Sequence, residues 1–98
     1  MTISKVLEGS KLTIMLEGRL DTTTSPALEA ELKEALTGIT ELVFDFEKLE
    51  YISSAGLRIL LANQKIMNKQ GSMVIKNVNE VIAEVFEVTG FADILTVI

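Results

Sequence analysis

The sequence predicts an α/β domain in which a mixed, mostly parallel sheet of about five strands carries three main helices. Three observations predict this fold. The chain opens with two alternating apolar stretches separated by a glycine–serine pair, which is typical of a β-hairpin. Three later stretches carry apolar residues at helical spacing, and short apolar runs alternate with those stretches. The resulting order is β-β-α-β-α-β-α-β, and such alternation implies parallel strands joined by helical crossovers.

The first two elements form the hairpin. Leu12, Ile14 and Leu16 alternate with more polar neighbours, which predicts a half-buried strand. A weaker alternation covers residues 3–8. The pair Gly9-Ser10 lies between the two stretches and suits a two-residue turn, because glycine tolerates the positive φ that such turns require.

A helix start follows the hairpin. Four hydroxyl residues at positions 22–25 precede Pro26, and we expect Ser25 to accept a hydrogen bond from a free N–H group of the first turn. Pro26 suits the first helical position because it has no N–H group to lose. Apolar residues then share one face up to residue 36, and Gly38 is the expected stop.

The remaining elements alternate between strand and helix. The apolar run at residues 42–46 predicts a strand buried on both faces, in the middle of a sheet covered by helices. The second helix is expected over residues 56–70. A strand at residues 73–75 precedes a third helix that Asn79 opens and Gly90 ends. The last apolar run, residues 94–98, is expected to be a closing strand.

Composition limits the classes of function. The 98 residues suit one domain, which we expect to span 1–98. With no cysteine and no histidine, the chain lacks thiolate chemistry, the commonest general base and the usual zinc ligands. A net charge of −5 argues against binding to nucleic acid, which needs a basic face. No apolar run is long enough to span a membrane or serve as a signal peptide. We therefore expect a cytoplasmic protein that is not an enzyme and uses no cofactor or metal.

The most informative polar segment covers residues 45–58. We expect the strand to end at Asp45, a solvated loop at residues 47–50, and two hydroxyls, Ser53 and Ser54, at the start of the second helix. A helix N-terminus stabilises an anion such as a phosphate. The simpler alternative is that one of these serines only caps the helix.

The segment resembles the signature of STAS domains, a family named after sulphate transporters and anti-sigma factor antagonists. The resemblance rests on residues 51–58, Tyr-Ile-Ser-Ser-Ala-Gly-Leu-Arg, which follow an apolar strand ending in Asp45. It extends to the opening hairpin, to residues 18–21 before the first helix and to Gly90-Phe91 near the end. Among family members, the free-standing bacterial antagonists are closest in size.

The resemblance implies a binding switch. An unphosphorylated antagonist of this family binds an anti-sigma factor that is also a serine kinase, and so frees the sigma factor. The kinase phosphorylates a serine two residues before the motif glycine, which ends binding, and a serine phosphatase restores it. The match here is Ser54, with Ser53 as a minor alternative acceptor. Ser53 stands where antagonists often carry aspartate, and Ala55 stands where they often carry a second hydroxyl.

The resemblance also implies a partner-binding surface. The residues expected to form it are Asp21, Ser53, Ser54, Ala55, Gly56, Leu57 and Arg58. Asp21 has an alternative role as a solvated carboxylate that helps the following helix to start, and Leu57 is also a good core residue. Asp45 is expected to be structural, as an acceptor for loop N–H groups. We expect the domain to be a monomer.

Two other functions remain open at this stage. In the first, the same fold serves as a regulatory subunit of a membrane transporter, such as a lipid-trafficking ABC system, and Ser54 is only a cap. In the second, Asp45 receives phosphate as in a response regulator, with Lys76 nearby. That function requires a cluster of acidic residues to hold magnesium.

Overall fold

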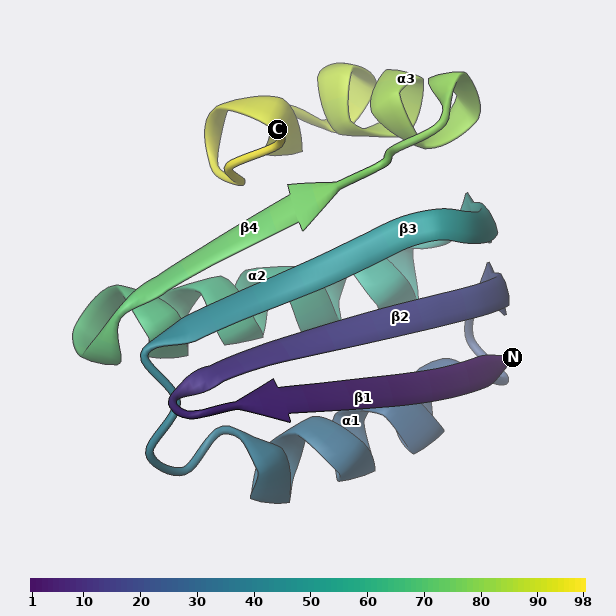
Figure 1. The fold of residues 1–98 in the computed structure, drawn as a ribbon. Helices are drawn as coiled ribbons and strands as arrows, with labels where there is room; N and C mark the ends of the chain where they lie inside the picture. The colour runs from purple at the N-terminus through teal and green to yellow at the C-terminus, as the bar shows by residue number, and fades with distance from the viewer.

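A computed structural model describes all 98 residues and shows one layer of strands with helices packed against it (Figure 1). The elements in chain order are β1 (Thr2–Glu8), β2 (Lys11–Leu20), α1 (Ser25–Ala35), β3 (Glu41–Ile52), α2 (Ser54–Gln70), β4 (Ser72–Lys76), α3 (Glu80–Thr89) and the short 3-10 helix η1 (Phe91–Asp93). The predicted order is therefore confirmed up to the third helix.

The four strands form one mixed sheet in the order β1-β2-β3-β4. β1 and β2 are antiparallel and form the predicted hairpin, with Gly9 at a φ of +63° in the turn. β2, β3 and β4 are parallel to one another. Each parallel pair is joined by a helix, so α1 and α2 are the two crossovers.

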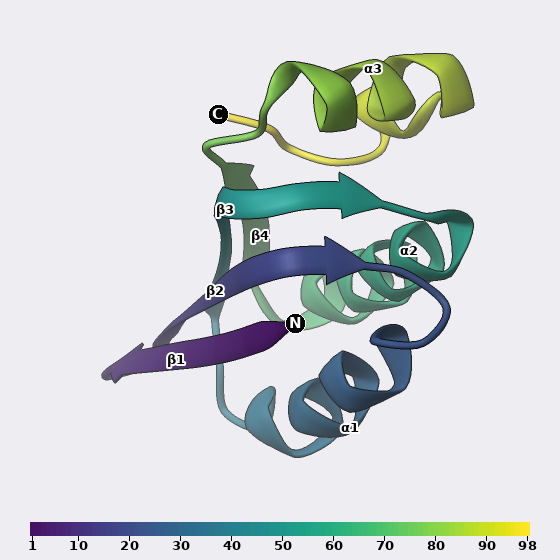
Figure 2. The same ribbon diagram turned by 90° about the vertical axis from the view of Figure 1, so that its right-hand side faces the viewer.

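Helices α1 and α2 lie side by side on one face of the sheet (Figures 1 and 2). Their apolar faces, the inward side chains of the strands, and residues of α3 and of the segments after α1 and η1 make a core of 22 buried residues. The opposite face of the sheet carries no helix, which corrects the expectation that helices cover both faces. Val43 is still buried on that face, because Thr13 and Val74 flank it in the neighbouring strands.

β3 is longer than the sequence predicts. It runs to Ile52, so residues 47–50 belong to the strand and the expected loop is wrong. The buried residues Phe46, Leu49 and Ile52 are three apart, whereas a regular strand buries every second residue. Two β-bulges explain this spacing, because opposite each of them β3 advances one residue more than β2.

The predicted closing strand at residues 94–98 is also wrong. The N–H groups of Ile94 and Leu95 both donate to the carbonyl of Phe91 in the turn around η1, so these groups are not available to pair with a strand. The segment reaches β4 only in one isolated bridge between Val97 and Ile75. Leu95 alone of these residues is buried.

The first helix begins differently from the expectation. Thr24 occupies the N-cap position and Ser25 is already helical, so the predicted capping role of Ser25 is wrong. The reason lies upstream, where the carboxylate of Asp21 accepts the N–H groups of Thr23 and Thr24 and starts the turn early. The Ser25 hydroxyl is buried and has no hydrogen-bond partner.

Helix α3 begins and ends as predicted and packs beside the free edge of β3. Its N-cap residue Asn79 accepts the N–H of Ile82 at 2.8 Å and donates to the carbonyl of Leu49 at 2.9 Å. β4 pairs with β3 only as far as Asp45, so Asn79 satisfies a backbone group that no strand covers. Gly90 ends the helix at a φ of +81°. None of the helices is both long enough and apolar enough to cross a membrane.

Candidate functional site

The predicted site residues lie at one end of the sheet, where β2 and β3 finish and α2 begins. Leu20 and Ile52 are paired at the ends of these two strands. The backbone N–H of Ser53 donates to the carbonyl of Leu20 at 2.9 Å. This bond brings the turn that contains Asp21 next to the turn that contains Ser54, which are more than thirty residues apart in the sequence.

Asp21 organises the turn between β2 and α1. One carboxylate oxygen accepts the Thr23 hydroxyl at 2.8 Å and the N–H groups of Thr23 and Thr24 at 3.0 and 3.2 Å. The hydrogen bond from the Thr23 hydroxyl has the largest effect on the pKa of the Asp21 carboxyl. It lowers the pKa of the carboxyl together with the bonds from the Thr24 and Thr23 N–H groups and the Thr24 hydroxyl, against a smaller opposing effect of desolvation. Asp21 is therefore a fixed negative charge at neutral pH.

Arg19 and Tyr51 extend this surface in a way that the sequence did not reveal. The Arg19 guanidinium lies 4.5 Å from the centre of the Tyr51 ring, and its Nε is 3.9 Å from the second oxygen of Asp21. Such a cation–π contact depends on the pairing of Arg19 with Tyr51 across two strands. Because a β-bulge sets that pairing, spacing along the chain could not have indicated it.

The two serines occupy different environments. Ser53 is the N-cap residue of α2 in extended conformation, but its hydroxyl oxygen is buried and makes no hydrogen bond. Ser54 begins the helix and is exposed. Ser53 thus occupies the N-cap position that the capping alternative assigns to one of the two serines, but neither hydroxyl makes a capping hydrogen bond. The first turn of α2 also contains no acidic residue.

Gly56 and Leu57 lie on the inner side of α2. A Cβ atom at Gly56 would be 2.7 Å from Ile52 Cγ1 and 2.8 Å from Leu20 Cγ, so glycine allows the helix to approach the strand ends closely. Leu57 is only 5% exposed. The structure therefore places these two predicted partner-binding residues beneath the surface, where they position Ser54 and Arg58.

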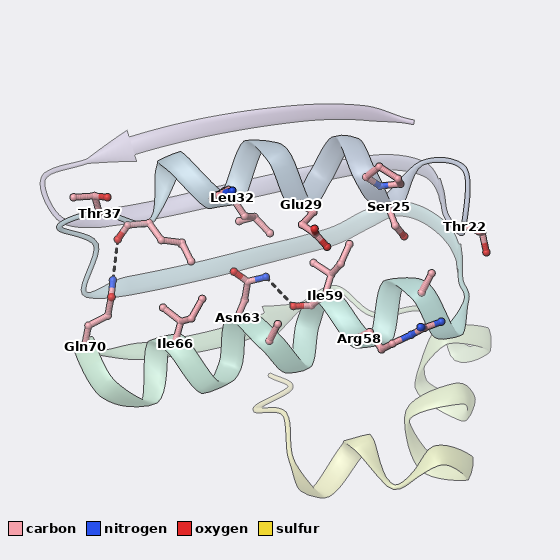
Figure 3. A pocket seen from close by; sticks show the side chains of 15 residues that line it. Thr22, Ser25, Glu29, Leu32, Thr37, Arg58, Ile59, Asn63, Ile66 and Gln70 are labelled. Atoms are coloured by element: carbon pink, nitrogen blue, oxygen red, sulfur yellow. Dashed lines mark hydrogen bonds between the residues drawn. The ribbon is translucent and has the colours of Figure 1, made fainter.

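Ala55 and Arg58 border a groove of about 790 Å³ between α1 and α2 (Figure 3). Thr22 and Ser25 border the same end of the groove from the other side. At the far end, Gln70 donates to the carbonyls of Leu36 and Ile39 and ties the two helices together. The groove thus opens between the two segments expected to contact a partner.

Asp45 lies apart from this surface, within β3. It accepts the N–H of Glu47 at 3.1 Å, at one of the bulges, and the side-chain amide of Asn77 at 2.9 Å. Partial burial acts to raise its pKa. The bonds from Asn77 and Glu47 and the charge of Lys76 outweigh that effect, so the pKa of Asp45 is lowered. No group of three or more acidic side chains could hold the magnesium that the response-regulator function requires.

Comparison with known proteins gives consistent matches. The family model described as "Mlab, STAS domain" matches residues 3–96. The chain is 35% identical to BtrV of Bordetella bronchiseptica, a protein classed as an anti-sigma factor antagonist, over 99% of this chain and 84% of that protein. It is 26% identical to the anti-sigma-B factor antagonist of Bacillus subtilis, over 86% of this chain and 78% of that one.

Solved structures share the fold. An anti-sigma factor antagonist from Mycobacterium paratuberculosis superposes with a TM-score of 0.88 at 22% identity, covering 98% of this chain and 83% of that one. The Bacillus cell fate determinant SpoIIAA in its phosphorylated form gives a TM-score of 0.77 at 19% identity, covering 99% and 91%. The relatives named as antagonists are regulators rather than enzymes, in agreement with the prediction from the sequence.

Proposed function

Because this chain belongs to the STAS-domain family of anti-sigma factor antagonists, we propose that it is an antagonist whose binding is switched by phosphorylation of Ser54. In the unphosphorylated form it binds an anti-sigma factor with serine kinase activity and so releases a sigma factor. A serine phosphatase reverses the modification. We further propose that residues 1–98 act as one STAS domain, monomeric and cytoplasmic.

The observation that carries the proposal is the difference between the two serines. Ser54 is exposed, whereas the Ser53 hydroxyl oxygen is shielded from solvent. A kinase must reach the hydroxyl oxygen to which it transfers the γ-phosphoryl group of ATP, while the hydroxyl proton is lost and ADP leaves. Accessibility therefore favours Ser54 over Ser53 as the acceptor.

The neighbouring charges explain why phosphorylation would end binding. A phosphate adds roughly −1.5 to −2 charges at pH 7. Ser54 and Asp21 lie on adjacent turns. Asp21 is ionised at neutral pH, and the hydrogen bonds that lower its pKa further favour the ionised form. A partner surface that is apolar or acidic and pressed against this end of the sheet would then face two neighbouring anions. Like-charge repulsion and desolvation would both oppose the complex.

A second function is favoured by one observation. The matching family model is described as "Mlab, STAS domain", rather than as an antagonist. Under this alternative the domain is a regulatory subunit of a membrane transporter and the same surface binds the transporter. Ser54 would then contribute only contact area, and its modification would not control the complex.

Affinity capture from the lysate of the native host separates the two functions. Ser54→Ala and Ser54→Asp variants serve as baits, and Ser53→Ala is the matched control with an intact Ser54. We expect the Ser54→Ala bait to capture an anti-sigma factor with kinase activity and the Ser54→Asp bait to lose it. Phosphorylation of wild type and Ser53→Ala by the captured kinase, but not of Ser54→Ala, would complete the test. Equal capture of transporter subunits by both Ser54 variants would contradict the proposal.

A further inference from the structure

Arg58 lies one helical turn after Ser54, and its side chain reaches back toward it. The Nε of Arg58 donates to the backbone carbonyl of Ser54 at 3.4 Å. Side chains on a helix lean toward its N-terminus, and residues four apart are neighbours on its surface. Figure 3 shows the Arg58 side chain running along α2 toward the start of that helix. The guanidinium is therefore already held beside residue 54.

The charge of Arg58 is not neutralised by any carboxylate. The two ion pairs of the molecule join Lys5 to Glu31 and Arg19 to Asp21. Arg19 also lies over the ring of Tyr51, so its guanidinium is engaged twice. The single hydrogen bond of Arg58 uses Nε and leaves both terminal nitrogens free. A cation with free donors thus lies next to the residue proposed to become an anion.

We propose that Arg58 is the intramolecular partner of the phosphate on Ser54. This inference rests on the proposed function, since it takes Ser54 as the residue that is modified. A phosphoserine presents three acceptor oxygens, and a guanidinium can donate to two of them at once. Phosphorylation would then exchange the weak bond to the Ser54 carbonyl for a charge-assisted bond to its phosphate.

The pairing gives the switch a second component. Arg58 is one of the exposed residues expected to contact the anti-sigma factor. Once its guanidinium binds the phosphate, it is no longer free to bind a carboxylate of the partner. Phosphorylation therefore adds negative charge to the surface and also withdraws a positive charge from it, within the same helical turn.

The test measures the phosphate directly and needs neither the kinase nor the partner. Phosphoserine is placed at position 54 during synthesis by genetic code expansion, and the second pKa of the phosphate is followed by ³¹P NMR titration at low salt. A nearby guanidinium favours the dianion, so we expect this pKa to be about 0.4 unit lower in the wild type than in Arg58→Gln. The difference should shrink at high salt, because exposed charges are screened.

Lys65→Gln is the matched control, because it removes one positive charge from an exposed position of the same helix away from the phosphate. It should leave the phosphate pKa unchanged. An equal pKa in wild type and Arg58→Gln, or an equal rise in both variants, would overturn the proposal. The circular dichroism spectra of the unmodified variants check that the fold is retained. Since the phosphate is installed without a kinase, a failure to find a kinase would contradict the proposed function and leave this result unaffected.

Discussion

The backbone N–H of Ser53 donates to the carbonyl of Leu20, and this bond joins the two halves of the candidate site. Leu20 ends β2 just before the turn organised by Asp21, and Ser53 is the N-cap residue of α2. Parallel strands finish at the same end of a sheet, so the loops that follow them meet there. The hydrogen bond fixes how closely they meet, and it places Asp21 and Ser54 on adjacent turns.

Gly56→Ala should destabilise the fold although alanine is the better helix former. Helix propensity alone would stabilise the variant by about 1 kcal/mol. The new Cβ would, however, lie within 3 Å of Ile52 and Leu20, both buried. Overpacking of this kind typically costs about 1–3 kcal/mol, so we expect a net loss in the free energy of unfolding measured with urea.

Ala62→Met provides the control for this prediction. Ala62 is exposed on the same helix and borders the open groove between α1 and α2, so the added atoms have room there and the free energy of unfolding should change by less than about 0.5 kcal/mol. A Gly56→Ala variant as stable as wild type would show that α2 can move away from the strand ends. The close approach would then not be what positions Ser54.

Most helices and strands could be predicted from the sequence because residues at their ends indicate where they begin and end. Asn79 and Gly90 bound α3 as expected, and Gly9 lies in the hairpin turn. The predictions failed where backbone groups form strand pairs or hydrogen bonds that the local sequence pattern does not indicate. The bulges of β3 interrupt the alternation of buried and exposed residues, so this part of the strand has the sequence pattern of a polar loop. The N–H groups of Ile94 and Leu95 bond to the carbonyl of Phe91 and are not available for a closing strand.

The candidate site was predicted in part for the same reason. A resemblance in residues 51–58 indicated the correct segment, and the structure brings Asp21 next to it. The apolar spacing of the second helix already offered Leu57 as a core residue. The sequence could not show that Gly56 faces inward, nor that the Ser53 hydroxyl is buried while Ser54 is exposed. These differences depend on how α2 sits on β2 and β3, which no local spacing encodes.

Asn79→Ala should destabilise the domain by about 1–3 kcal/mol. The substitution removes the cap of α3 and also leaves the carbonyl of Leu49 without its partner. Urea unfolding of Asn79→Ala and Asn79→Asp separates the two losses. Aspartate keeps the acceptor for Ile82 but cannot donate to Leu49, so its stability should lie between those of alanine and wild type. Equal stability of all three proteins would contradict the role assigned to Asn79.

Asp45→Asn should change how stability depends on pH. The pKa of Asp45 is lower in the folded protein than its ordinary value of 3.8, so its ionised form stabilises the fold. That contribution is present in full above the ordinary pKa and is lost as the pH falls through the lowered one. The variant should therefore be less stable than wild type at pH 7, by less than about 1 kcal/mol because the group is partly solvated.

The stability difference should close as the pH is lowered below 3.8, which urea unfolding at several pH values measures. Glu87→Gln is a suitable control, because Glu87 is exposed and its carboxylate makes no ion pair. A gap between Asp45→Asn and wild type that stays constant down to acid pH would mean that the charge of Asp45 is not responsible.

Ser53→Ala should be at least as stable as wild type. A buried hydroxyl without a partner costs free energy, because it gives up its hydrogen bonds to water and gains none. Its removal should raise the free energy of unfolding by up to about 1 kcal/mol, measured by urea unfolding. The bond from the Ser53 backbone to Leu20 does not involve the side chain, so the site should keep its shape. A clear loss of stability in Ser53→Ala would mean that the hydroxyl does cap α2 in solution, and the argument for Ser54 as the accessible serine would lose its basis.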